Sequence, residues 1–280
     1  MGIDFRHALA AAERRHDSLL CVGLDPEPAK FPAGWRDDPR RILDFCCAIV
    51  DATHDLVLAF KPQVAYFAAH RAEAALEALV AHIHRVAPAV PVILDAKRGD
   101  IGATGEQYAA EAFERYGVDA VTLSPYMGRD SIEPFLRHDG KGVFLLCRTS
   151  NPGGDDLQSL KLEDGGRLFE HVARLAAGAW QREGRVGLVV GATYPQELAR
   201  VRELAPTLPL LIPGVGAQGG DAAATVRAAW RAGAPIAVNA SRAVLYAGAG
   251  DDFADAARAS ANALRLALNA ARAARAEVQA

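Results

Sequence analysis

Short apolar runs recur at even intervals along this chain, and each is followed by a turn and a segment with helical periodicity. Eight of these runs predict strands, at 19–24, 56–60, 90–94, 120–123, 143–147, 186–190, 208–212 and 235–238. The segments that follow them predict helices, at 38–55, 64–87, 104–116, 128–137, 167–183, 195–204, 221–231 and 252–276. Eightfold strand–helix alternation in 280 residues favours an α/β fold, the (β/α)8 or TIM barrel.

We expect a single domain over residues 1–280, with an N-terminal helix at about 4–17 and a C-terminal helix at about 252–276. With 51% hydrophobic residues, the chain can bury a core of that size. The alternative is an open doubly wound sheet, which would carry a Gly-rich dinucleotide-binding turn after its first strand. That place holds Gly23-Leu24-Asp25-Pro26 instead, so the barrel is favoured.

Charge and cysteine content exclude several classes of protein. The net charge is −3 and the basic residues are scattered, so no nucleic-acid-binding footprint is present. Residues 1–17 are charged and amphipathic, unlike a signal segment, and no apolar run reaches membrane-spanning length. The four cysteines lack Cys-x-x-Cys spacing, which is typical of free thiols in the reducing cytoplasm. His82 and His84 cannot share a helix face, so no His-based metal site is expected.

A dense group of charges follows the third predicted strand. Asp95 and Lys97 stand where this apolar run should reach the surface, and their spacing places both on one face of an extended strand. Asp100 follows on the loop, beyond a glycine. A lysine held between carboxylates at a strand's carboxyl end is charged, oriented and ready to give up a proton. The alternative is a structural salt bridge that ties the strand to the next loop.

Lysine usage favours the catalytic interpretation. Only five of the 31 basic residues are lysines, so arginine is the ordinary surface cation of this chain. Lys61 and Lys97 each close an apolar run, whereas the other three lie in Pro-, Gly- or charge-rich stretches. Arginine is permanently protonated, while lysine is a compact proton donor. The two strand-end lysines are therefore predicted to be functional.

The loops after the seventh and eighth strands predict a phosphate site. Glycines that let the backbone approach a ligand closely follow the seventh strand, at Gly214, Gly216, Gly219 and Gly220. A helix is predicted to begin at 221, and Ser241 and Arg242 follow the eighth strand. In a barrel all strand carboxyl ends meet at one mouth, and these two loops are its usual phosphate site. The long Gly-rich connection at 148–166 predicts a lid over the same mouth.

These residues resemble those of a known family, the orotidine 5′-phosphate decarboxylases. The matching motifs run in family order from residue 19 to 246 and are Gly23-Leu24-Asp25-Pro26, Phe60-Lys61-Pro62, Asp95-Ala96-Lys97-Arg98-Gly99-Asp100-Ile101, Thr149-Ser150-Asn151-Pro152, Pro213-Gly214-Val215-Gly216-Ala217-Gln218-Gly219-Gly220 and Asn239-Ala240-Ser241-Arg242. The form of the third motif and the length of the chain look like the longer bacterial (type 2) branch.

The resemblance implies decarboxylation of orotidine 5′-phosphate to uridine 5′-phosphate (UMP) and CO2, the last step of de novo pyrimidine nucleotide biosynthesis. It implies no cofactor and no metal. By the same resemblance Lys97 would be the proton donor, in an alternating charge array with Lys61, Asp95 and Asp100. It also implies a homodimer with shared active sites, because Asp100 would reach into the neighbouring subunit's site.

The resemblance assigns substrate contacts as well. Asp25 would hold the ribose hydroxyls with Lys61, and Thr104 would contact the ribose across the dimer interface. Ser150 would bind the pyrimidine. The phosphate would be held by Gln218 and Arg242, supported by Gly216 and Ser241.

Two alternatives stay open. Mg²⁺-dependent sugar-phosphate decarboxylases and aldolases of the same barrel superfamily share the Asp-x-Lys-x-x-Asp motif, but they bind the metal through a glutamate on strand two and the aspartate on strand three. Strand two here ends in Lys61, which would repel a cation. The other alternative is a catalytically silent barrel that binds a nucleotide. The complete charge array argues against it, because unpaired buried charges are costly to keep.

Overall fold

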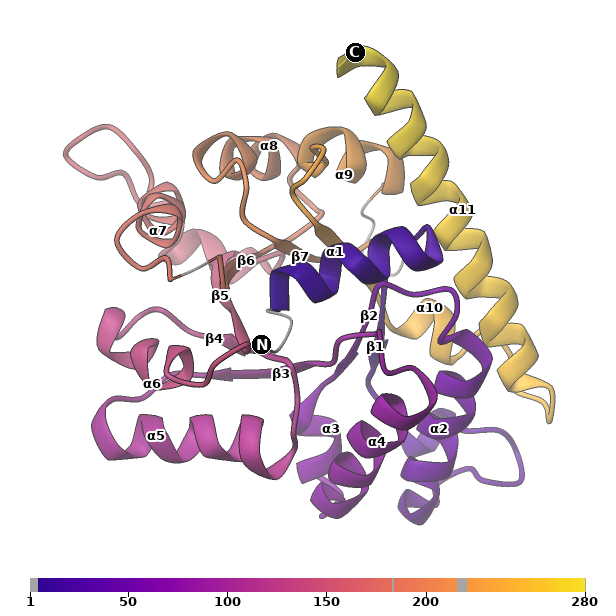
Figure 1. Cartoon of the computed structure of the whole chain (residues 1–280). Helices are drawn as coiled ribbons and strands as arrows, with labels where there is room; N and C mark the ends of the chain where they lie inside the picture. Colours follow the sequence, from indigo (N-terminus) through magenta and orange to yellow (C-terminus); the bar gives the residue numbers. More distant parts are fainter. Residues whose placement is uncertain (1–4, 183, 216–220, 280) are drawn as a thin grey trace.

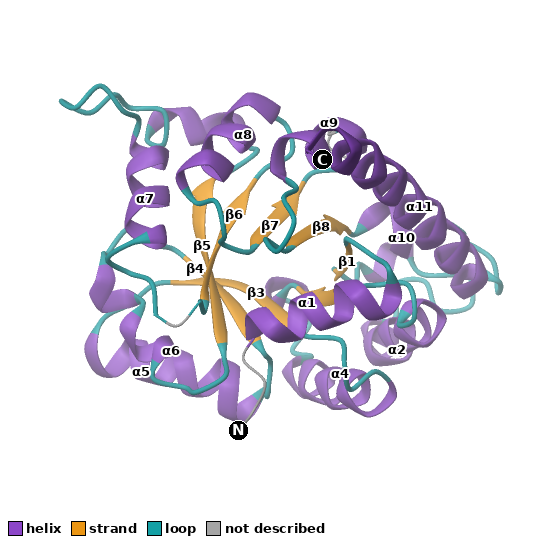
Figure 2. Cartoon of the chain, turned by 45° about the horizontal axis from the view of Figure 1, so that its top comes forward, coloured by secondary structure: helices purple, strands orange, loops and turns teal. Residues whose placement is uncertain are grey.

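The computed structural model describes residues 5–182, 184–215 and 221–279, and these form a ring of parallel strands surrounded by helices (Figures 1 and 2). The strands are β1 (Leu20–Leu24), β2 (Ala59–Pro62), β3 (Ile93–Arg98), β4 (Ala120–Leu123), β5 (Gly142–Arg148), β6 (Val186–Val190), β7 (Leu210–Pro213) and β8 (Ile236–Ala240). Their order in the sheet is β2-β1-β8-β7-β6-β5-β4-β3. Parallel bridges from Phe60 to Val92 and from Gln63 to Asp95 join β2 to β3 and close the ring. The predicted (β/α)8 barrel is confirmed.

Helices surround the ring, and most of them lie on its outside with one apolar face buried against it. They are α1 (Phe5–His16), α2 (Ile42–Thr53), α3 (Val64–Ala68), α4 (Glu73–Val86), α5 (Gly102–Ala110), α6 (Glu133–Leu136), α7 (Leu168–Ala177), α8 (Pro195–Leu204), α9 (Ala222–Ala229), α10 (Arg242–Leu245) and α11 (Phe253–Gln279). In α2 the buried positions Ile42, Phe45, Ile49 and Thr53 recur at three- and four-residue spacing, which gives the helix its inner face. Within the described residues, no helix is both long and apolar enough to span a bilayer.

Helix α1 closes the amino-terminal end of the barrel (Figure 2). Its Phe5 and Leu9 belong to the same buried cluster as inward-facing side chains at the starts of the strands. The ring of Phe5 meets Phe144 edge to face, with 5.5 Å between centroids. A Cβ on Gly142 would lie only 2.2 Å from Phe5, so the first position of β5 has to be glycine. The barrel is thus sealed at this end, and only the carboxyl-terminal mouth is left for a ligand.

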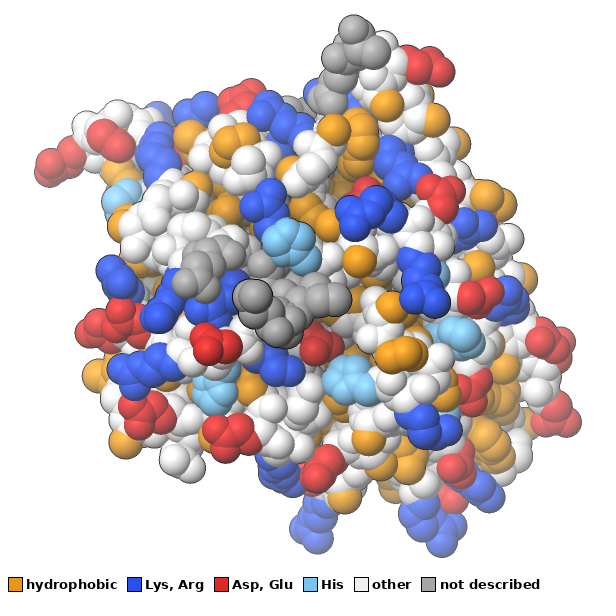
Figure 3. Space-filling view, in the orientation of Figure 1, with side chains coloured by type: hydrophobic (Ala, Val, Ile, Leu, Met, Phe, Trp, Pro, Cys, Tyr) orange, Lys and Arg blue, Asp and Glu red, His pale blue; other side chains and the backbone are white. Residues whose placement is uncertain are grey.

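The long helix α11 runs down one side of the molecule and packs on α2, α9 and α10 (Figure 1). Arg258 on α11 donates to both carboxylate oxygens of Asp55, at 2.6 and 2.8 Å. Figure 3 shows the face that carries α1, on which Lys and Arg side chains are interspersed with Asp and Glu. Mixed charge of this kind favours solvation over attraction to a polyanion.

The secondary structure differs from the sequence-based expectation in two instructive places. The helix predicted at 64–87 is divided into α3 and α4, because Arg71 between them adopts a φ of +54°. Strand β3 continues to Arg98, four residues beyond the end of the apolar run. Hydrophobicity marks the part of a strand that faces the core, whereas backbone pairing continues into the polar mouth. The charged residues therefore belong to the strand itself.

Candidate active site

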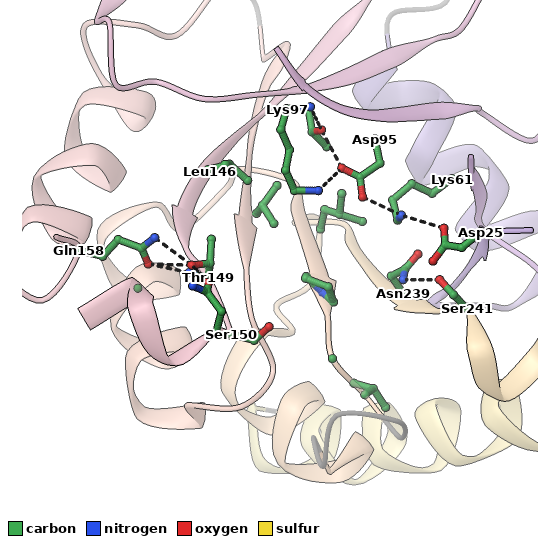
Figure 4. A pocket seen from close by; sticks show the side chains of 18 of the residues that line it. Asp25, Lys61, Asp95, Lys97, Leu146, Thr149, Ser150, Gln158, Asn239 and Ser241 are labelled. Carbon is green, nitrogen blue, oxygen red and sulfur yellow. Dashed lines mark hydrogen bonds and ion pairs between the residues drawn. The ribbon is translucent and has the colours of Figure 1, made fainter. Parts of the chain in front are cut away.

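The carboxyl ends of the strands surround a cavity of about 580 Å³ (Figure 4). Its sequence-predicted lining residues are Asp25, Lys61, Asp95, Lys97, Ser150, Ser241 and Arg242. Leu146, Val189 and Leu211 also line the cavity, and the last two belong to the cluster that packs on α1. The cavity therefore combines an apolar floor with charged walls, an arrangement that strengthens electrostatic interactions with a bound ligand.

Asp95 lies between two lysines. Its Oδ2 accepts a hydrogen bond from Nζ of Lys61 at 2.9 Å, and its Oδ1 accepts one from Nζ of Lys97 at 2.5 Å. Thr122 on β4 donates its hydroxyl to Oδ1 of Asp95 at 3.0 Å. Asp25 extends the row, with its Oδ1 4.0 Å from Lys61 Nζ. The four charges alternate in sign across three adjacent strand ends.

Pairing keeps these groups ionised although they are buried. Burial alone would lower the pKa of Lys61, but the charges of Asp95 and Asp25 outweigh it and raise that pKa above its usual value. Burial would likewise raise the pKa of Asp95, but the two ammonium groups hold it well below its usual range. Lys61 and Asp95 are therefore both charged over the physiological pH range.

The backbone at Lys97 is strained. Its φ is +48°, in the left-handed region that side-chain-bearing residues rarely adopt. Leu94 pairs with Val121 and Arg98 with Leu123, so β3 bulges relative to β4 over this stretch. The N–H groups of Ala96 and Lys97 both donate to Oγ1 of Thr122 at 3.0 Å, which holds the bulge in place. Strain held by surrounding contacts is typical of functional positions, and here it directs the ammonium toward Asp95.

Strands β1 and β8 form the wall that continues from Asp25. Asn239 on β8 donates its Nδ2 to Oγ of Ser241 at 3.3 Å. A Cβ on Gly23 would lie 1.9 Å from that hydroxyl oxygen, so β1 needs glycine here to make room for it. The phenol of Tyr246 donates to the carbonyl of Asp25 at 2.8 Å and fixes the turn after β1.

The loop after β5 is anchored by Arg148, which is only 2% exposed. Its Nε donates to Glu197 on α8 at 2.5 Å, and its Nη2 donates to Asp155 within the loop at 2.6 Å. Gln158 accepts from the backbone N–H of Thr149 at 2.8 Å. These contacts hold Ser150 at the cavity wall. Sequence reasoning placed Asn239 in the motif after strand eight but gave it no role, and it did not identify Arg148, Gln158 or Thr122 as site residues.

Two predicted residues lie away from the cavity of their own chain. Asp100 is not among its lining residues, and its Oδ1 accepts the N–H of Ile101 at 2.8 Å. Thr104 is exposed in the first turn of α5. Gly216 and Gln218 fall outside the described residues, while their neighbours Gly214 and Val215 line the cavity.

Known proteins match nearly the whole length of this chain. The orotidine 5′-phosphate decarboxylase of Methylibium petroleiphilum is 70% identical over 278 residues, which cover 96% of this chain and 100% of that protein. That of Polaromonas naphthalenivorans is 70% identical over 272 residues, 96% of each chain. The solved structure of Leishmania donovani OMP decarboxylase superposes with a TM-score of 0.85 at 41% identity, covering 96% of this chain and 99% of that one.

A sequence profile of one family matches residues 18–259, which include all eight strands and every polar residue of the cavity. The relatives cover nearly the whole chain at high identity. The chain belongs to the orotidine 5′-phosphate decarboxylase / HUMPS family.

Proposed function

We propose that this chain catalyses the decarboxylation of orotidine 5′-phosphate to UMP and CO2, the last step of de novo pyrimidine nucleotide biosynthesis. The observation that carries the proposal is the Asp95 carboxylate paired with the ammonium groups of Lys61 and Lys97 inside the cavity. Relatives named orotidine 5′-phosphate decarboxylase, 70% identical over nearly the whole chain, support the same substrate.

The chemistry needs a cation beside the reacting carbon. When CO2 leaves, the bonding electron pair remains on carbon six of the pyrimidine ring. An ammonium fixed next to this carbon stabilises the developing negative charge and then donates a proton to form the C–H bond of UMP. We assign this role to Lys97, which lines the cavity and keeps 46% of its side chain exposed. The neutral amine that results recovers a proton from solvent.

The other charges position this donor. Asp95 accepts from both lysines, so it keeps the ammonium of Lys97 oriented until the proton is transferred. Lys61 is buried between Asp95 and Asp25 and acts through its charge and through the ribose hydroxyls. Ser150, at the start of the anchored loop, binds the pyrimidine.

The phosphate group is assigned to the opposite side of the cavity. Arg242 begins α10 and lines the cavity together with Ser241 and Gly214. A planar guanidinium suits a phosphate because it can donate two parallel hydrogen bonds. We also assign Gln218 and Gly216 to the phosphate. Phosphate lies far from the bond that breaks, so its binding energy can close loops over the substrate and offset desolvation.

We further propose a homodimer with shared active sites, in which Asp100 and Thr104 complete the partner's cavity. Two observations support this pairing. Asp100 lies outside the lining of its own cavity. Exposed apolar side chains flank it on the loops after β3 and β4, where Ile101 is 48%, Tyr126 79% and Met127 47% exposed. An isologous contact through these loops would bury the apolar side chains and bring each Asp100 to the other subunit.

The reaction is proposed to proceed without a metal ion or cofactor. The ammonium of Lys61 stands beside Asp95 and would repel a cation there. The proposed location is the cytoplasm, because the four cysteines are free thiols and three of them are buried.

The test is incubation of the purified protein with orotidine 5′-phosphate in a metal chelator, with the loss of orotate absorbance followed over time. We expect UMP and CO2 in equal amounts at a rate that the chelator leaves unchanged. Activity that disappears with chelator and returns with Mg²⁺ would favour a metal-dependent sugar-phosphate enzyme. Tight UMP binding without turnover would favour a silent nucleotide-binding barrel.

A further inference from the structure

One polar side chain in the cavity has no part in the mechanism above. Asn239 on β8 lines the cavity and is only 8% exposed. Its Nδ2 donates to Ser241, but its Oδ1 is buried and accepts no hydrogen bond from any residue that the structure describes. A buried acceptor without a donor costs about 1–3 kcal/mol. This oxygen is therefore suited to a hydroxyl or amino group of a ligand.

The strand register fixes where this oxygen lies. Cys21 on β1 pairs with Asn239, and a Cβ on Gly23 would lie 3.1 Å from its Oδ1. The amide thus occupies the space that a larger residue at position 23 would fill. Asp25 comes two residues after Gly23, which puts its side chain on the same side of the chain. Figure 4 shows Asn239 and Asp25 both directed into the cavity from these two strands.

Asp25 has a similar unsatisfied oxygen. Its Oδ1 is buried and accepts no hydrogen bond within the described part of the chain, and Lys61 Nζ is 4.0 Å away from it. Asp25 and Asn239 therefore present two acceptor oxygens from adjacent strands. A ligand with two neighbouring O–H donors matches this pair, and a ribose has such a pair in its 2′,3′-cis-diol.

We infer that Asn239 is a substrate-binding residue that selects ribonucleotides. Its Oδ1 accepts a hydrogen bond from one hydroxyl of the ribose diol, and Asp25 accepts from the other. Ser241 accepts from Nδ2 and so fixes the amide with its oxygen toward the ligand. A deoxyribonucleotide leaves one buried acceptor unpaired, and sites built around a hydroxyl strongly reject analogues that lack it. The inference rests on the proposed function, which supplies a ribonucleotide as substrate.

The test measures the dissociation constants of UMP, 2′-deoxy-UMP and 3′-deoxy-UMP by calorimetry. The proteins are the wild type and Asn239→Leu, which keeps the side-chain volume but removes the acceptor. Asn239→Ala is a second variant, and Asn262→Ala on α11, whose side chain contacts Arg265, is the control. Losing one hydrogen bond in a buried site should weaken UMP binding about tenfold. Asn262→Ala should bind all three nucleotides like the wild type.

The decisive result is whether the effect of removing a ribose hydroxyl depends on the presence of the Asn239 side chain. In the wild type, loss of the ribose hydroxyl that donates to Asn239 should weaken binding about tenfold. In the Asn239 variants the same loss should have almost no effect on the dissociation constant, because the partner of that hydroxyl is already gone. Equal weakening toward all three nucleotides, or unchanged UMP affinity, would overturn the inference. Binding needs no turnover, so a wild type that binds UMP without decarboxylating would contradict the proposed function and leave this test intact.

Discussion

The ammonium nitrogen of Lys97 lies 2.5 Å from Oδ1 of Asp95, although both residues belong to the same strand and are only two positions apart. The contact depends on the bulge of β3 and on the positive φ of Lys97. Backbone strain and the buried carboxylate of Asp95 thus fix the position of Lys97. Lys97 is also the more exposed of the two lysines in the array, with 46% of its side chain exposed against 5% for Lys61. A proton donor needs both properties, a fixed position and access to the substrate.

The first prediction concerns the charge of Asp95. Asp95→Asn removes the partner of two cations, one of them buried, and should lower the free energy of unfolding at pH 7 by about 3–5 kcal/mol. The folded-state pKa of Asp95 is depressed, so its contribution is complete above the unfolded pKa of about 4 and decreases as pH falls toward the folded value. Urea denaturation should therefore give a difference between wild type and variant that is smaller at pH 3 than at pH 7. If the difference in the free energy of unfolding is the same at pH 3 and pH 7, the pKa of Asp95 is not lowered by its pairing with the lysines.

The second prediction concerns the phosphate. Arg242→Ala should lower kcat/KM for orotidine 5′-phosphate roughly 10- to 100-fold, the effect of losing a charge-assisted hydrogen bond. The unphosphorylated nucleoside orotidine should be hardly affected. Steady-state kinetics with both substrates measure this difference. Equal losses for the two would mean that Arg242 acts elsewhere than on the phosphate.

The third prediction concerns the loop after β5. Arg148 and Arg167 both donate to Glu197, but their side chains are 2% and 46% exposed. Arg148→Met should lower the free energy of unfolding by about 2–3 kcal/mol and weaken UMP binding, because Ser150 loses its anchor. The matched variant Arg167→Met should change stability by less than about 1 kcal/mol. Similar effects for both variants in urea denaturation would rule out a special role for the buried arginine.

The fourth prediction concerns the dimer. Lys97→Ala and Asp100→Ala should each be inactive, and mixing them under subunit exchange should restore activity. In a hybrid dimer one site carries both defects and the other neither, so activity should reach up to about half of normal per hybrid. Mass spectrometry of differently tagged subunits verifies the exchange. If the subunits are verified to exchange and activity does not recover, Asp100 belongs to the site of its own subunit.

The sequence predicted the barrel because apolar runs and helical periodicity are local properties, and the ring follows from their repetition. It placed Lys61, Asp95 and Lys97 at one mouth for the same reason. It did not reveal that Arg148 is buried, because burial of an arginine depends on Glu197, 49 residues away in sequence. Nor did it indicate the bulge that aims Lys97, since the hydroxyl of Thr122 that holds it comes from another strand.

The most direct measurement of the central claim is single-turnover decarboxylation by Lys97→Ala, compared with wild type and with the remote variant Lys141→Ala. Removing a general acid that also stabilises the transition state should slow UMP formation by at least about 10³-fold, while UMP affinity falls far less. Lys141→Ala should react like the wild type. Decarboxylation by Lys97→Ala within tenfold of the wild-type rate would contradict the account, because the proton would then come from another group.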